Sequence, residues 1–244
     1  MSIKTFPTFK TFLTLCRVSN LPTVWMNVLT AALLVSSYTH SPFDAGAVIL
    51  LMVSMSLFYM GGMSFNDYMD RNWDGIHQKF RPIPSGKISA RAVAIISAAL
   101  FLSALVLLAF APHITGFYMG FVLLLTIVIY DAFHKATAAS VFVMASARML
   151  VFFVTARALV EDWLFVIWLA ASLQFIYTLL LTVVARYEHT RQKNYSIPLI
   201  PLMIAGMSLV DGILLAILVH PLGLLAGIFA AFATRFGQKY VRGD

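Results

Sequence analysis

The chain has 244 residues, of which 61% are apolar and only 11% charged, with a mean hydropathy of +0.88 and a formal net charge of +7. Soluble domains are about 45–50% apolar and about 25% charged, so this composition excludes a water-soluble globular protein and indicates an integral membrane protein. The single cysteine, Cys16, excludes an intrachain disulfide and a thiolate metal site.

Apolar runs follow one another along the chain, each long enough for a helix of about 20 residues to cross the roughly 30 Å hydrocarbon layer. The eight expected spans are 12–38, 43–65, 89–111, 114–133, 138–159, 163–184, 197–219 and 222–240. Prolines mark the starts of four runs, namely Pro42, Pro112, Pro198 and Pro221. Pro22 lies inside the first run and predicts a bend there. Because each amide in lipid needs a partner within its own segment, we predict one all-α transmembrane bundle over residues 1–244.

Basic residues predict the orientation of this bundle. If the N-terminus is cytoplasmic, all 17 lysines and arginines except Arg148 and Arg157 lie on the cytoplasmic side. The connections on the other side contain Asp44, Glu161 and Asp162. The positive-inside rule therefore explains the pI of 9.7, and no nucleic-acid partner is required. We expect a multi-pass protein of a bacterial inner membrane, surrounded by the lipid bilayer, with its functional site on the cytoplasmic side.

The end of the second run carries four oxygen-bearing side chains. At 3.6 residues per turn, Asn66, Asp70 and Asp74 share one helix stripe, and Asp67 lies beside it. Like charges at this spacing repel one another, so the cluster predicts a bound cation. Mg²⁺ prefers carboxylate oxygens and keeps waters or phosphates as further ligands, which suits a metal-bridged diphosphate. The alternative is a solvated helix end whose acidic residues have no special role.

A basic loop, 79–87, follows the acidic stretch. Two prolines stiffen this loop, and Gly86 permits a tight turn. Its lysine and arginine side chains can contact phosphate oxygens that a metal leaves free. We favour such a ligand contact for Arg81, whereas positive-inside charge is the preferred explanation for Lys87 and Arg91.

The pattern Asn66-Asp67-x-x-Asp70-x-x-x-Asp74, followed by Arg-Pro-Ile-Pro-Ser-Gly over 81–86, resembles the first signature of the UbiA superfamily of intramembrane prenyltransferases. The resemblance implies an all-helical bundle, normally with nine spans. It also implies Mg²⁺-dependent transfer of an isoprenyl group from a prenyl diphosphate to an aromatic or other small lipophilic acceptor. The four residues of the pattern would hold the Mg²⁺ and the diphosphate.

Two further segments resemble the family. The end of the fourth run, 130–135, is similar to its tyrosine-then-lysine stretch, which implies that Lys135 faces the diphosphate. Arg17 and Asn20 occupy the polar start of the first helix and are candidate substrate ligands. The ring of Tyr130 can stabilise a cationic carbon fragment of the donor.

The implied chemistry is the departure of diphosphate from an allylic carbon. Mg²⁺ would stabilise the negative charge on the leaving group together with basic side chains, for which the candidates are Arg81, Lys135, Lys79 and Arg186. Asp131 either orients or deprotonates the acceptor, or pairs with Lys135 four residues on and has no chemical role.

The second acidic motif of the family departs from its usual form in this chain. Two spaced aspartates normally follow the sixth span, whereas segment 185–191 contains Glu188 as its carboxylate. Either Glu188 replaces the missing pair as a metal ligand, or that metal site is lost. Eight expected spans instead of nine also imply an open lipid-facing wall or an oligomer.

Two charged residues lie within the expected spans. Charges are unfavourable at that depth, so Arg148 and Asp211 are each expected to have a partner, and each is a candidate partner for the other.

Three other functions are alternatives to a prenyltransferase. The main alternative to an enzyme is a non-catalytic member of the family that binds an isoprenoid or amphipathic small molecule for transport or assembly. A CDP-alcohol phosphotransferase is disfavoured because its Asp-Gly-x-x-Ala-Arg pattern is absent after Gly75. A transporter is disfavoured because the polar residues collect at one face rather than at the midplane.

Overall fold

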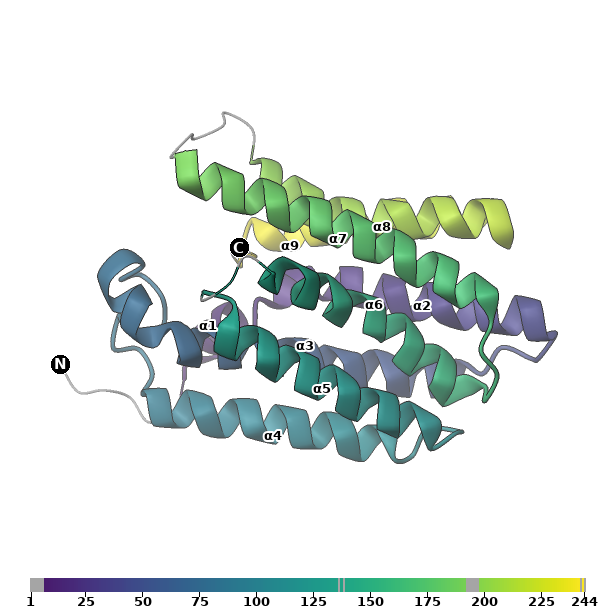
Figure 1. Cartoon of the computed structure of the whole chain (residues 1–244), viewed down its shortest axis with the longest axis horizontal. Coiled ribbons are helices and arrows are strands. Elements are labelled where there is room, and N and C mark those ends of the chain that lie inside the picture. Colours follow the sequence, from purple (N-terminus) through teal and green to yellow (C-terminus); the bar gives the residue numbers. More distant parts are fainter. Residues whose placement is uncertain (1–6, 136, 138, 192–197, 242, 244) are drawn as a thin grey trace.

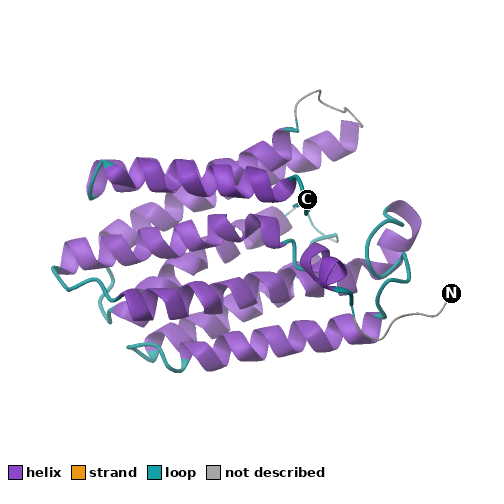
Figure 2. Cartoon of the chain, turned by 180° about the vertical axis from the view of Figure 1, so that it is seen from behind, coloured by secondary structure: helices purple, strands orange, loops and turns teal. Residues whose placement is uncertain are grey.

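The computed structural model describes residues 7–135, 137, 139–191, 198–241 and 243, without the side chains of 187–191. Over these residues the chain forms helices and loops and contains no strand (Figure 2). The elements in chain order are α1 (Phe9–Leu15), the 3₁₀ turn η1 (Val18–Asn20), α2 (Leu21–Thr39), α3 (Ala45–His77), α4 (Ala90–Leu108), α5 (Thr115–Phe133), α6 (Ser140–Leu159), α7 (Phe165–Arg191), α8 (Leu199–Leu218) and α9 (Leu222–Gln238). The predicted all-α fold is confirmed.

Within the described ranges, seven helices, α2 to α8, are long and apolar enough to cross a membrane. The last expected span corresponds to α9, which is apolar but has only 17 residues. Large apolar side chains are exposed along the outer faces of several helices, among them Leu102, Phe121, Ile217 and Phe229. Such faces are expected in a protein that is surrounded by hydrocarbon.

From α2 to α9 the helices lie side by side, and successive helices run in opposite directions (Figure 1). The polar end is the end of the bundle at which α1 begins and α3, α5 and α9 end, on the left in Figure 1. The acidic stretch and the basic loop therefore lie at the same end as the connection between α5 and α6. Alternation of helix direction thus gathers the polar segments that the sequence distributes along the chain.

Local side-chain chemistry sets several helix starts. The carboxylate of Asp44 accepts a hydrogen bond from the amide of Ala47 at 3.0 Å and caps α3. The hydroxyl of Ser89 accepts one from the amide of Ala92 at 3.2 Å and caps α4. These side chains satisfy amides that have no partner within the helix. Pro198 and Pro221 stand at the N-caps of α8 and α9, where the absence of an amide hydrogen removes no helical bond.

The first expected span is broken rather than bent. Helix α1 ends at Leu15, Arg17 adopts the left-handed conformation with φ 45°, and η1 leads into α2. Pro22 consequently lies in the first turn of α2, where proline is tolerated, and the prediction of a bend at this residue is wrong. The break directs the chain so that Arg17 and Asn20 lie beside the end of α3.

Helix α3 is longer than the second expected span. Its 33 residues extend over about 50 Å, well beyond the roughly 30 Å hydrocarbon layer, and the helix continues through the acidic stretch to His77. The predicted stripe of Asn66, Asp70 and Asp74 is therefore part of one continuous helix.

Apolar packing occurs in two main clusters. One is formed by residues of α2 to α6 and includes Leu51, Phe58, Phe101 and Leu108. The other is formed by residues of α2, α6, α7, α8 and α9 and includes Met26, Leu34, Phe152 and Leu215. Helices α2 and α6 contribute to both clusters and so join the two parts of the bundle.

Helices α8 and α9 approach each other closely at glycines. A Cβ atom on Gly227 would lie 2.6 Å from the carbonyl oxygen of Ser208 and 2.7 Å from the Cα atom of Gly212. Both neighbours are backbone atoms, so a side chain at Gly227 would force the helices apart.

We expect Gly227→Ala to lower the free energy of unfolding by about 1–3 kcal/mol, because overpacking against rigid backbone is unfavourable. Thermal unfolding in detergent micelles measures this effect. Gly75→Ala is the matched control, since a Cβ there meets nothing within 4 Å. Equal midpoints for the two variants would contradict the packing described here.

Candidate functional site

Three carboxylates of α3 are buried at the polar end. Asp67, Asp70 and Asp74 are 4%, 8% and 1% exposed, as the helical stripe brings them to the inner side of the bundle. The side-chain amide of Asn66 donates to Oδ1 of Asp131 on α5 at 3.0 Å. The predicted cluster is therefore a buried one, which disagrees with the alternative of a solvated helix end.

Two arginines, one before and one after α3 in the sequence, contact the carboxylates. Arg81 Nη1 lies 2.7 Å from Oδ1 of Asp67 and 3.3 Å from Oδ2 of Asp74. Arg17 Nη2 lies 3.3 Å from the same oxygen of Asp67. A hydrogen bond of 2.6 Å from Arg81 Nε to Oε1 of Gln78 holds the guanidinium in place. Arg81, which we predict to contact phosphate oxygens of a ligand, thus lies next to the acidic stripe.

The third carboxylate, that of Asp70, is paired with residues that directly follow α5. Lys135 Nζ lies 2.6 Å from Oδ1 of Asp70, and His134 Nε2 lies 3.3 Å from Oδ2. The hydrogen bond to Asp70 raises the pKa of His134 above its ordinary value, against the effect of burial, and so favours the imidazolium form. Lys135 Nζ also lies 4.5 Å from the ring centroid of Trp73. Basic side chains of the chain itself therefore offset the repulsion expected within the stripe.

Two carboxylate groups retain unsatisfied oxygens. Neither oxygen of Asp74 accepts a hydrogen bond, although the side chain is fully enclosed. Asp131 accepts from Asn66 through Oδ1, whereas its buried Oδ2 has no hydrogen-bond donor.

Lys135 contacts Asp70, so the alternative in which Asp131 pairs with Lys135 is wrong. Among the residues with described side chains, no three His, Cys, Asp or Glu groups converge on one point.

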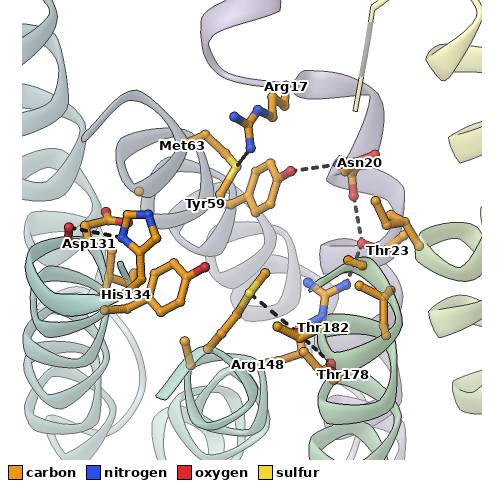
Figure 3. A pocket seen from close by; sticks show the side chains of 18 of the residues that line it. Arg17, Asn20, Thr23, Tyr59, Met63, Asp131, His134, Arg148, Thr178 and Thr182 are labelled. Atoms are coloured by element: carbon orange, nitrogen blue, oxygen red, sulfur yellow. Dashed lines mark hydrogen bonds between the residues drawn. The ribbon is translucent and has the colours of Figure 1, made fainter. Parts of the chain in front are cut away.

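A cavity of about 880 Å³ extends from this polar cluster into the bundle (Figure 3). Its polar end is lined by Arg17, Asn20, Tyr130, Asp131, His134, Lys135 and Arg186. Its deeper part is mostly apolar and includes Met55, Phe58, Leu123, Ile127, Val151, Leu181 and Ile204. This volume is within the range of small-molecule sites, roughly 300–1,000 Å³. The cavity therefore suits a ligand with a charged head and a long apolar part.

The structure places most of the predicted site residues in two adjoining groups. Arg17, Asn20, Tyr130, Asp131, Lys135 and Arg186 line the cavity, and Asn66, Asp67, Asp70, Asp74 and Arg81 form the adjacent cluster. Lys79 is exposed on the loop after α3 and does not line the cavity, so its predicted contact with substrate is not supported. Glu188 belongs to α7, but its side chain lies outside the described residues, and its role as a metal ligand stays a prediction.

Asn20 is held by several bonds. Its side-chain amide donates to the hydroxyl of Tyr59 at 3.0 Å and to the carbonyl of Gly243 at 2.8 Å, and Gln238 donates to its oxygen at 3.1 Å. The chain beyond α9 thus reaches back to the cavity rim. Sequence reasoning did not single out Tyr59, because a tyrosine within an apolar span carries no motif.

The suggested pairing of the two intramembrane charges is wrong. Asp211 accepts hydrogen bonds from the amides of Asn27 and Gln174, and Arg148 donates to the hydroxyl of Thr23. No ion pair joins Arg148 to Asp211 among the described contacts.

Sequence reasoning did not single out His134 either. Its position directly before Lys135 is the signal that could have identified it.

The UbiA prenyltransferase family matches residues 24–239 of this chain. The match covers most of the sequence, and the chain belongs to this family. The resemblance that rested on the acidic stretch and the following loop is thereby confirmed.

Individual relatives match over parts of their length. A digeranylgeranylglyceryl phosphate synthase of Methanothrix thermoacetophila is 42% identical over 64 residues, which cover 26% of this chain and 22% of that protein. A synthase of the same name from Metallosphaera sedula is 30% identical over 185 residues, covering 74% of this chain and 63% of that protein. These matches span less than two thirds of either relative.

Solved structures share the fold over almost the whole chain. A digeranylgeranylglyceryl phosphate synthase structure has a TM-score of 0.63 at 19% identity and covers 95% of this chain and 93% of the other. A UbiA homologue from Archaeoglobus fulgidus bound to DMAPP and Mg²⁺ has a TM-score of 0.61 at 18% identity, over 91% and 86% of the two chains.

The ion pairs of Arg81 generate a prediction about stability. In Arg81→Met, Asp67 keeps only Arg17 as an ion-pair partner among the described residues and Asp74 loses its contact, so we expect the free energy of unfolding to fall by about 3 kcal/mol. Denaturant unfolding in micelles measures the loss. Lys79→Met, at an exposed position of the same loop, should stay within about 0.5 kcal/mol of the unmodified protein. Similar losses in both variants would disprove the importance of the buried pairs.

Proposed function

We propose that the protein transfers an isoprenyl group from a prenyl diphosphate to a small lipophilic acceptor, in a Mg²⁺-dependent reaction at the cytoplasmic face of the membrane. The observation that carries this proposal is the meeting of buried carboxylates and basic side chains at the mouth of a mostly apolar cavity. A prenyl diphosphate has the same division into a charged head and an apolar tail. The positive-inside distribution of lysine and arginine supports the cytoplasmic location.

The acidic stripe supplies oxygen ligands of the kind that a magnesium ion prefers. Neither buried oxygen of Asp74 accepts a hydrogen bond, and the ion-pair contact of this carboxylate is that of Oδ2 with Arg81 Nη1 at 3.3 Å. Asp67, Asp70 and Asn66 supply further hard oxygen ligands beside them, as Mg²⁺ prefers. Glu188 is proposed as an additional ligand from α7. When bound, Mg²⁺ supplies positive charge that favours departure of the diphosphate. The fold neighbour from Archaeoglobus fulgidus, which binds DMAPP and Mg²⁺, supports this assignment.

Basic side chains bind and orient the diphosphate. Arg17, Lys135 and Arg186 line the mouth of the cavity. Arg81 contacts Asp67 in the adjacent cluster. Guanidinium groups form short, charge-assisted hydrogen bonds to phosphate oxygens, and these bonds strengthen as negative charge develops on the leaving group. The allylic carbon–oxygen bond breaks, and its electron pair leaves with the diphosphate.

The cavity wall protects the cationic carbon fragment. Tyr130 lies at the mouth, with its ring 5.1 Å from that of His134, and presents an aromatic surface that favours positive charge. The apolar lining below excludes water, which would otherwise capture the fragment. The isoprenyl group is therefore directed to the acceptor.

Asp131 is proposed to accept a proton from the acceptor. Its Oδ1 is fixed by Asn66, and its Oδ2 accepts no hydrogen bond from the protein, while the residue lines the cavity. A carboxylate that is oriented in this way can accept a proton from a group that approaches through the cavity.

A second candidate function is binding without turnover. It is favoured by the ion pairing of all three stripe carboxylates, because these pairs would have to be exchanged before a metal is coordinated. A non-catalytic member of the family would then use the same cavity to bind an isoprenoid or another amphipathic molecule.

Metal-dependent release of diphosphate from labelled geranyl or farnesyl diphosphate distinguishes the two functions. We expect release with the unmodified protein in the presence of Mg²⁺, and a fall of at least about 100-fold in Asp67→Asn/Asp70→Asn, because transition-state charge stabilisation is lost. Asp162→Asn, an exposed acidic position outside the cavity lining, is the control and should retain full release. Metal-independent binding of the donor without release would favour the non-catalytic function.

The role of Asp131 is tested separately from donor binding. In Asp131→Asn we expect kcat for transfer to fall about 100-fold, as is typical for loss of a general base, with KM for the donor within about 3-fold of its original value. Steady-state kinetics at saturating acceptor measures both parameters. A variant with unchanged kcat would remove Asp131 from the reaction.

A further inference from the structure

Arg91 lies on the lipid-facing side of α4, at the polar end of the bundle. Helix α4 forms one edge of the bundle, the lower one in Figure 1, and exposes Ile95, Leu102 and Val106 along one stripe. At 3.6 residues per turn, the exposed Arg91 continues this stripe one turn before Ile95, whereas Val93 and the other buried residues of α4 lie on the opposite side. The 19 residues of α4 extend over about 28 Å, close to the thickness of the hydrocarbon layer. Arg91 in its first turn is therefore at the depth of the lipid headgroups.

Helix α1 and the loop after α3 adjoin the start of α4. Leu15 of α1 packs with Ile88 and Val93 in a small apolar cluster, which holds the three segments together. The exposed side chains of these adjoining segments form the basic corner, which consists of Phe9, Lys10, Lys87 and Arg91. The corner is separate from the cavity, whose lining includes none of its four residues.

The basic corner has no counter-charge in the described part of the protein. No ion pair formed by the described residues includes a base of this corner. At the polar end, the carboxylates with described side chains are those of the acidic stripe and Asp131, and they are buried. The exposed carboxylates with described side chains lie at the other end of the bundle, namely Asp44, Glu161 and Asp162. The dipole of α4 also disfavours a cation in its first turn. A compensating anion for the corner therefore comes from outside the described protein.

We propose that the basic corner binds the headgroup of an anionic phospholipid. The acyl chains of this lipid lie along the apolar stripe of α4, and its phosphate contacts Arg91 and Lys87, while Lys10 contributes from α1. Phe9 adds an apolar ring beside these bases, a combination that favours the membrane interface. The corner continues directly into a stripe that faces hydrocarbon, and this continuity favours a lipid over an acidic protein.

Lipid binding at the basic corner stabilises the segments that carry two bases of the functional site. Arg17 lies just after α1, and Arg81 belongs to the loop that ends at Lys87. Both arginines contact Asp67. A ligand that binds only the folded arrangement of these segments raises the midpoint of thermal unfolding. An anionic lipid should therefore stabilise the protein more than a zwitterionic lipid does.

Native mass spectrometry of the whole chain in detergent measures this binding. Dioleoylphosphatidylglycerol and dioleoylphosphatidylcholine have the same acyl chains and differ in headgroup charge. At low ionic strength we expect the unmodified protein to bind phosphatidylglycerol about 30–100-fold more tightly, because each of three bases near the headgroup contributes about 5-fold. In 0.5 M ammonium acetate the preference should fall at least about 5-fold, because salt screens exposed charges. Thermal unfolding with the same two lipids should give the higher midpoint with phosphatidylglycerol.

Removal of two bases from the corner tests its position. In Lys87→Gln/Arg91→Gln we expect the affinity for phosphatidylglycerol to fall about 25-fold, with the affinity for phosphatidylcholine within about 3-fold of its original value. Lys79→Gln/Lys239→Gln is the matched control, because it removes the same charge from exposed positions at the polar end outside the corner. This control should stay within about 3-fold of the unmodified protein for both lipids.

Three outcomes would overturn the assignment. Equal binding of the two lipids by the unmodified protein would remove the preference for an anionic lipid. Equal losses in the two double variants would attribute the preference to net charge alone. Tight binding of poly-glutamate without a preference between the lipids would assign the corner to an acidic protein. Because these measurements involve no turnover, their result is independent of whether the protein transfers an isoprenyl group.

Discussion

Compensation of buried charge at the polar end organises this protein. Asp67 and Asp70 belong to one helix, yet their partners Arg17, Arg81 and Lys135 come from three different connections. Because an unpaired buried carboxylate is strongly unfavourable, these ion pairs hold the break before α2, the loop after α3 and the end of α5 against one another. Two of these bases, Arg17 and Lys135, also line the mouth of the cavity.

The cavity extends this separation of charge and apolar surface into the bundle. Its mouth is basic and acidic, its depth is mostly apolar, and Arg148 adds one cationic position on the inner wall. A charged head can then remain near the membrane boundary while an apolar chain lies among the helices.

Sequence reasoning succeeded where the governing interactions are local. The apolar runs and the stripe of Asn66, Asp70 and Asp74 follow from helical periodicity, which depends on residues a few positions apart. It failed where the same local pattern is compatible with two conformations, because the first run breaks before Pro22 instead of bending at it. It also could not tell the two bases of the loop after α3 apart, of which Lys79 is exposed and Arg81 pairs with Asp67.

The amino-acid sequence by itself determined the class of protein, the order of the helices and the acidic surface of α3, because hydropathy and helical repeat are properties of contiguous residues. Only the tertiary structure decided which base meets which carboxylate, that Asp131 keeps a free oxygen, and that Arg148 faces the cavity without Asp211. These relations join helices that are distant in the sequence. They depend on the rotation and packing of each helix against its neighbours, which side-chain volumes across the whole bundle settle together.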